Sequence, residues 1–105
     1  MYNKLQAGKP FNGTATHATA AAVTITAVTG RSHYVTDVEA SSDKAGSILT
    51  IKDGTTVKFQ VQVGADSFRH MFQSPIRCTA GAVVLVEIDG TSACKANVQG
   101  FTVKP

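Results

Sequence analysis

The chain has 105 residues, of which 43% are hydrophobic and 16% charged, and its formal net charge at pH 7 is +3. This length fits one domain with a modest core, and the composition excludes wholesale disorder. The basic residues are scattered without a stripe, which argues against nucleic-acid binding. No apolar run is long enough to span a membrane. The start, MYNKLQAGKPFNG, lacks the apolar centre of a secretion signal, so we expect synthesis and action without export.

Residues 1–13 contain two glycines and a proline and show no alternation of apolar and polar residues. We therefore predict an extended N-terminal arm, followed by one domain over residues 14–105. Apolar and basic side chains in the arm could order on a partner surface, at an entropic cost. The predicted partner-binding residues of the arm are Tyr2, Lys4, Leu5, Lys9 and Phe11.

From Thr14 onward, apolar and polar residues alternate with a period of two, which is typical of half-buried β-strands. The clearest stretch covers residues 56–63, and no window has helical spacing. About eight short strands without helices predict an all-β fold, a jelly-roll-type antiparallel β-sandwich. An Ig-like sandwich is the alternative, which the absence of Trp disfavours.

Two Asp-Gly pairs, at residues 53–54 and 89–90, lie between apolar strands and predict hairpins. At the first, a three-residue turn ending in a left-handed Gly54 keeps the inner and outer faces separate. That turn pairs Leu49 with Val57. We predict the same turn at the second pair.

The reactive side chains form no recognisable catalytic or metal site. With the second hairpin in that register, Cys94 opposes Val84 and Cys78 lies out of its reach, so we expect two free thiols. The histidines lack metal-ligand spacing, and we expect no metal and no cofactor. His70 shares a face with neighbouring phenylalanines, where a packing role is expected. Cys78 with His70 lacks a third orienting residue and an oxyanion hole, so we do not expect a nucleophilic pair. Ser32, His33 and Asp37 lie near one strand entry, where the geometry of a catalytic triad is not expected.

Three stretches resemble small structural proteins encoded among the head genes of tailed bacteriophages. They are GRSHYVTDVEASSDKAGSILTIKDGTTVKFQ, FQSPIRCTAGAVVLVEIDG and ACKANVQGFTV, and together they cover roughly residues 30–103. Their order is an aromatic strand entry, a Ser-rich loop, a hairpin with Asp-Gly, and a closing Asn-Val-Gln-Gly-aromatic strand. The resemblance implies a trimeric jelly roll without a cofactor that decorates the capsid surface and fastens neighbouring capsomers. It transfers no defined binding residues.

The expected function is therefore that of a non-enzymatic virion structural protein, made in the host cytoplasm and bound to the major capsid protein. A carbohydrate- or receptor-binding module of the tail-fibre or lectin-like kind is the alternative. Low charge and many small residues favour self-association, and we expect a homotrimer. The predicted oligomer face holds Val83 and Leu85, which point away from the core-facing Val84 and Val86.

Overall fold

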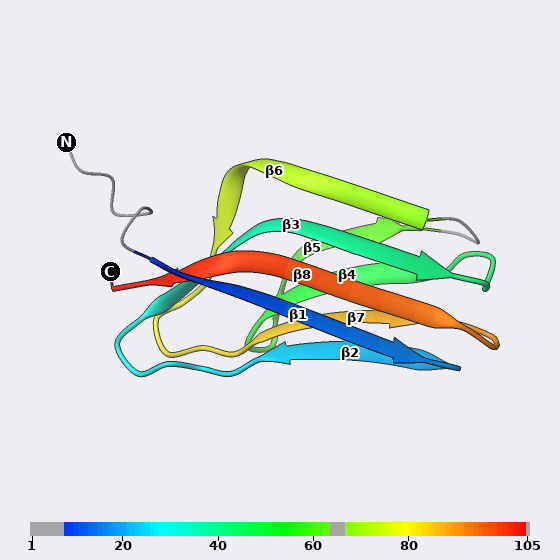
Figure 1. Ribbon diagram of the computed structural model, residues 1–105, viewed down its shortest axis with the longest axis horizontal. Coiled ribbons are helices and arrows are strands. Elements are labelled where there is room, and N and C mark those ends of the chain that lie inside the picture. Colours follow the sequence, from blue (N-terminus) through cyan, green and yellow to red (C-terminus); the bar gives the residue numbers. More distant parts are fainter. Residues whose placement is uncertain (1–7, 64–66, 105) are drawn as a thin grey trace.

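The computed structural model describes residues 8–63 and 67–104 and shows two packed antiparallel sheets (Figure 1). The described residues contain no helix, and hence none that is long and apolar enough to cross a membrane. Eight strands follow one another along the chain: β1 (Lys9–His17), β2 (Ala20–Ile25), β3 (Ser32–Ser42), β4 (Ile48–Asp53), β5 (Thr56–Gln62), β6 (Ser67–Arg77), β7 (Val84–Asp89) and β8 (Cys94–Val103).

The strand orders are β1-β8-β3-β6 in one sheet and β2-β7-β4-β5 in the other. Among the described strands, only β4 and β5 are both consecutive in the chain and paired in a sheet, because each other pair of consecutive strands is divided between the two sheets. Eight strands with these crossing connections form the double Greek key of a jelly roll. The predicted all-β jelly-roll sandwich is therefore confirmed, and the Ig-like alternative is not the topology of this chain.

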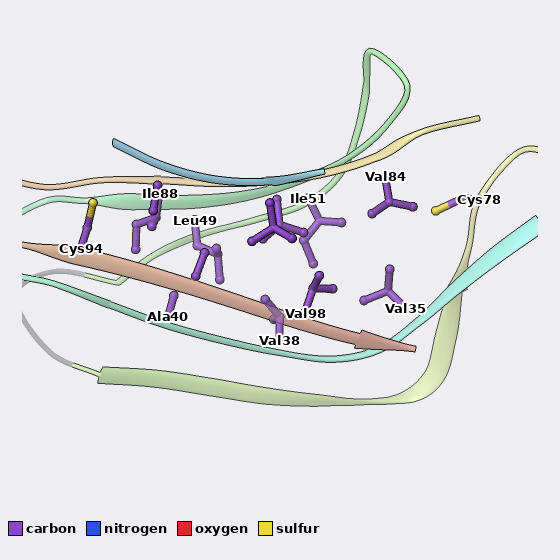
Figure 2. Packing of buried hydrophobic residues seen from close by; sticks show 14 residues of the cluster. Val35, Val38, Ala40, Leu49, Ile51, Cys78, Val84, Ile88, Cys94 and Val98 are labelled. Carbon is purple, nitrogen blue, oxygen red and sulfur yellow. The ribbon is translucent and has the colours of Figure 1, made fainter. Parts of the chain in front are cut away.

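The core lies between the sheets, where the inward positions of each strand meet (Figure 2). Small β-branched side chains dominate it, which keeps the two sheets close and leaves each strand alternating between buried and exposed positions. Full burial of such a side chain stabilises the fold by about 1.5–3 kcal/mol. The fully buried members include Val35, Val38, Leu49, Ile51, Val84, Val86, Ala96 and Val98.

The β4–β5 hairpin differs from its predicted register. Leu49 pairs with Val61 rather than Val57, and Asp53 pairs with Thr56 across a two-residue turn. An irregularity after Ile51 shifts the pairing by one residue. This shift keeps the inner and outer faces of the hairpin separate, which is the effect expected of the predicted three-residue turn. The left-handed conformation predicted for Gly54 is confirmed, with φ of 62°.

The second predicted hairpin is wrong, because β7 and β8 belong to different sheets. Cys94 pairs with His17 and Ser42 rather than with Val84. The chain after β7 turns a corner between the sheets, and the Gly90 N–H donates to the Thr19 carbonyl at 2.8 Å. A corner and a hairpin both accept Asp-Gly, so the dipeptide could not distinguish them. Cys78 and Cys94 are both free and buried, at opposite ends of the core (Figure 2).

The predicted arm is partly a strand. Residues 9–13 belong to β1 and pair with residues 98–102 of β8, so the arm does not extend to residue 13. The inward positions of β1 are Phe11, Gly13 and Ala15, and the glycine hides the period-two pattern. A Cβ at Gly13 would lie 2.4 Å from Val23 Cγ1, so the β1–β2 packing requires this glycine. Residues 1–7, with the predicted contacts Tyr2, Lys4 and Leu5, lie outside the described residues.

Candidate functional site

The outer face of the β1-β8-β3-β6 sheet carries a row of ring-bearing side chains at one end. In that row Pro10 pairs with Phe101, Phe101 with Tyr34, and Tyr34 with Arg77. The Tyr34 and Phe101 rings are stacked, with centroids 5.3 Å apart and planes at 13°. Both rings are half-buried, which leaves part of this aromatic pair in contact with solvent. Such a pair is a flat apolar platform on an otherwise polar surface.

Polar side chains fill the next rows of this outer face. Asn97 Nδ2 donates to Thr14 Oγ1 at 2.7 Å, and Gln99 Nε2 donates to Asp37 Oδ2 at 3.1 Å. A shallow depression of about 190 Å³ follows, lined by Glu39, Ala40, Ser41, Ser67, Lys95 and Asn97. Amides and carboxylates beside an aromatic platform offer the donors, acceptors and stacking surface that a polyhydroxylated ligand uses.

A second surface, the open edge, lies where β5 and β6 form the last strands of their sheets without pairing to each other. An aromatic cluster bridges them. The His70 ring stacks on Phe59 at 5.6 Å and on Phe68 at 6.2 Å, and Phe72 meets the Phe59 and His70 rings edge-on. His70 therefore packs against neighbouring phenylalanines as expected, although the residue itself remains exposed to solvent.

Two large apolar side chains on these edge strands are exposed to solvent: Met71 of β6 at 69% and Val57 of β5 at 49%. One side of each edge strand also lacks a neighbouring strand, so its backbone groups can pair with another chain. Exposed apolar side chains beside unpaired strand edges are typical of protein-binding surfaces.

The predicted contact residues within the described chain are separated. Lys9 is exposed on β1, whereas Phe11 points into the sandwich and its ring meets the His33 ring edge-on at 5.4 Å. Phe11 is thus a packing residue in this structure. Val83 and Leu85 are half-buried, and Leu85 pairs with Thr24 and Lys52 across the second sheet, away from the open edge.

The buried His33 has a structural role. Its side chain is 1% exposed, Nδ1 lies 2.8 Å from Thr102 Oγ1, and Nε2 lies 2.8 Å from the Thr26 carbonyl oxygen. Both ring nitrogens are therefore satisfied without Ser32 or Asp37. Across residues 8–63 and 67–104, no three His, Cys, Asp or Glu side chains are grouped as metal ligands. Burial and the charge of Asp53 raise the pKa of the Cys78 thiol to about 11, so it is neutral at physiological pH.

The sequence matches no protein-family model and no curated protein. Among solved structures, it is similar to a carbohydrate-binding module CBM36 in complex with calcium and xylotriose. That structure shares 14% identity, with 94% of this chain and 97% of that chain covered, at a TM-score of 0.48. The lysozyme inhibitor PliG of Aeromonas hydrophila shares 8% identity over 91% of this chain and 89% of its own, at a TM-score of 0.44. At these values we draw no functional conclusion from either likeness.

Proposed function

We propose that this protein is a non-catalytic virion structural protein that decorates the outer surface of a tailed-phage head. The phage resemblance of residues 30–103 supports the class of protein, and the jelly roll agrees with the fold which that resemblance implies. The single observation that carries the proposal is the open edge, where Met71 and Val57 are exposed beside two unpaired strands. The proposed partner of the protein is the major capsid protein, and its proposed location is the capsid surface.

Physical chemistry favours the open edge over the rest of the surface as the attachment site. Met71 shares the outer face of Asp37 and Val57 shares that of Lys52, so a partner that straddles the edge would remove both side chains from water, which drives association. A partner strand can also continue either ladder through backbone hydrogen bonds. Lys58 of β5 and Arg69 of β6 flank the edge and would pair with acidic groups on a capsid exterior.

Sedimentation with undecorated heads tests this proposal. The paired change Met71→Gln and Val57→Thr should lower capsid occupancy at least tenfold, which corresponds to about 1.4 kcal/mol of binding free energy. Val28→Thr is the matched control, because Val28 is 40% exposed but lies in the loop after β2. Wild-type occupancy of the paired variant would refute attachment through this edge. Failure of the wild-type chain to sediment with heads would refute the decoration role.

A second candidate function is glycan recognition on the outer face of the β1-β8-β3-β6 sheet. The specific observation is the Tyr34–Phe101 stack, which continues into the Asp37–Gln99 and Asn97–Thr14 hydrogen-bonded pairs. Neutral oligosaccharides should bind the wild-type chain, and Tyr34→Ala should abolish binding because a sugar ring loses its stacking partner. Thr24→Ala, an exposed change on the other sheet, should leave it intact. Equal binding by both variants would exclude this face.

A further inference from the structure

Strand β6 has a regular, unpaired edge over residues 67–71. In this stretch its pairing with β3 is continuous, from Ser67 with Ser41 to Met71 with Asp37, and the pairing becomes irregular beyond Met71. Such a stretch spans about 14 Å, since each step along a strand rises about 3.4 Å. Among the residues that the structure describes, no turn or loop forms a backbone hydrogen bond to residues 67–71. A partner strand can therefore extend this sheet for the length of that stretch.

Two side chains of this stretch point into the space between the sheets. Phe68 pairs with the buried Ala40 and His70 pairs with the buried Val38, so both rings lie on the inner side of the sheet. His70 is nevertheless exposed, because no strand of the described chain lies beside β6 on that side. An incoming strand would place its own side chains opposite Phe68 and His70. Apolar groups at those positions would bury the exposed aromatic surface.

The outer side of the same stretch carries one cation at its centre. Arg69 is exposed and lies between the exposed Ser67 and Met71. Glu39 of β3 pairs with Arg69 along the backbone, but the two side chains form no ion pair. An acidic residue on an added strand would lie directly opposite Arg69, where opposite charges stabilise a sheet. The edge therefore fits a segment with apolar residues facing inward and an acidic residue facing outward.

Two other pairings at the open edge are disfavoured. The regular part of β5 points Gln60 and Gln62 outward, and these amides offer neither apolar area nor charge to a partner. A second copy of β6, paired antiparallel over residues 67–71, would bring Arg69 opposite Arg69. Like charges at directly opposed positions destabilise a sheet. A different chain, paired with β6, is therefore the favoured occupant.

We infer that residues 67–71 of β6 bind an extended segment of the major capsid protein as an added strand. The segment has apolar side chains opposite Phe68 and His70 and an acidic side chain opposite Arg69. Backbone hydrogen bonds continue the β1-β8-β3-β6 sheet, and the side chains select the partner. This inference rests on the proposed decoration role, and it specifies which strand of the open edge binds and what kind of segment it accepts.

Hydrogen–deuterium exchange of the full chain, free and bound to undecorated heads, tests the inference. Backbone N–H groups of residues 67–71 that face away from β3 should exchange at least tenfold more slowly on heads, because the added strand accepts their hydrogen bonds. Residues 9–17 of β1, the other edge of this sheet, are the internal control and should exchange equally in both states.

The other outcomes of this measurement separate the inference from the decoration role. Unchanged exchange of residues 67–71 in a chain that sediments with heads would overturn the inference and leave decoration intact. Slower exchange of residues 56–62 alone would assign the strand pairing to β5 and also overturn it. Protection of residues 67–71 in the free chain that rises with protein concentration would assign the edge to a second copy. A chain that does not sediment with heads would refute both proposals.

The charge of the bound segment is tested with one variant and a matched control. Arg69→Gln should lower head occupancy at least threefold and make binding less sensitive to salt, because one ion pair is lost. Arg31→Gln removes another exposed arginine, from the loop before β3, and should bind as the wild type does. Equal melting temperatures of the two variants show that both are folded. Wild-type occupancy and salt dependence of Arg69→Gln would overturn the assignment of an acidic residue opposite it.

Discussion

The Asp43 carboxylate holds the backbone of Ser92, which lies 49 residues further along the chain. The Ser92 N–H donates to Asp43 Oδ2 at 2.9 Å, the Ser92 hydroxyl donates to the same oxygen, and the Thr91 N–H donates to Oδ1 at 2.8 Å. Two loops at one end of the sandwich, before β4 and before β8, are thereby joined. The Ser92 and Thr91 hydrogen bonds hold the pKa of Asp43 well below its usual range.

Acid should weaken this junction. A carboxylate with a lowered folded-state pKa contributes stability that is complete above its unfolded pKa, about 4, and is lost as pH falls below that value. Asp89, whose pKa is lowered by Lys44 and then Ser47, adds to the same effect at the same end. The melting temperature of Asp43→Asn should therefore fall less between about pH 5 and pH 2 than that of the wild type. Glu39→Gln is the control. Parallel plots of melting temperature against pH for the wild type and Asp43→Asn would contradict the stabilising role of the Asp43 carboxylate.

Substitution of two glycines by alanine should lower the free energy of unfolding by different amounts, because the two sites are constrained in different ways. A Cβ on Gly100 would lie 2.0 Å from the Tyr34 carbonyl oxygen and 2.6 Å from Phe11 Cζ, so Gly100→Ala should cost on the order of 3 kcal/mol. Gly54 has open space around it but a φ of 62°, so Gly54→Ala should cost only about 1 kcal/mol. Chemical denaturation measures both. The reverse ranking would show that the β3–β8 contact is looser than described.

Removal of β1 residues should destabilise the fold. A chain that begins at Thr14 lacks five of the nine β1–β8 residue pairs and the Phe11–His33 contact. Its melting temperature should fall well below that of a chain beginning at Gly8, which keeps every pair. Circular dichroism during heating gives the comparison. Equal melting temperatures would show that residues 8–13 add nothing to the sandwich.

The two thiols should be inert in the folded protein. Cys78 is buried and has a pKa raised to about 11, and Cys94 is buried at the other end of the core. A thiol-specific reagent at pH 8 should react with both residues only at the rate of unfolding. Reducing agents should leave the melting temperature unchanged. Rapid stoichiometric labelling in buffer without denaturant would contradict this prediction.

Self-association into a trimer stays a prediction. Light scattering of the wild-type chain at micromolar concentration should give about three chain masses. If Val83 and Leu85 form the interface, Leu85→Lys should shift the population to monomers, since it would bury an unpaired charge. Thr24 pairs with Leu85 on the neighbouring strand, so Thr24→Lys tests whether the trimer interface extends from Leu85 to β2. A monomeric wild-type chain would rule out the trimer.

Alternation of side chains was sufficient to predict the class of fold but not the partners of its strands. Val84, Val86 and Ile88 are buried, as their period indicates, and no helix interrupts the described strands. Which strand pairs with which depends on connections that cross between sheets, and Asp-Gly serves both a hairpin and a corner here. The short ladder irregularity beside Lys52 likewise has no residue signature of its own.

The candidate surfaces were even less accessible from sequence. Tyr34 and Phe101 are 67 positions apart and meet only because β8 lies beside β3. Asp53 reads as a turn residue, and nothing nearby in the sequence indicates that Thr79 binds its carboxylate. The only available signal was that these aromatic and charged side chains occupy outward or terminal strand positions. The pairing of strands that are far apart in the sequence therefore determines which side chains meet at each candidate surface.

The break within β6 has a consequence for colloidal behaviour. As the last strand of its sheet, β6 could recruit like strands from neighbouring molecules into a growing fibril. Its pairing with β3 passes directly from Met71 to Ile76, and the four intervening residues, which include Pro75, bulge and bend the strand (Figure 1). Proline donates no backbone hydrogen bond, and a bulge twists an edge away from a straight partner. The bulge therefore limits how far an identical strand could pair along β6 and disfavours amyloid-like stacking, whereas residues 67–71, which pair regularly with β3, can still accept a partner strand.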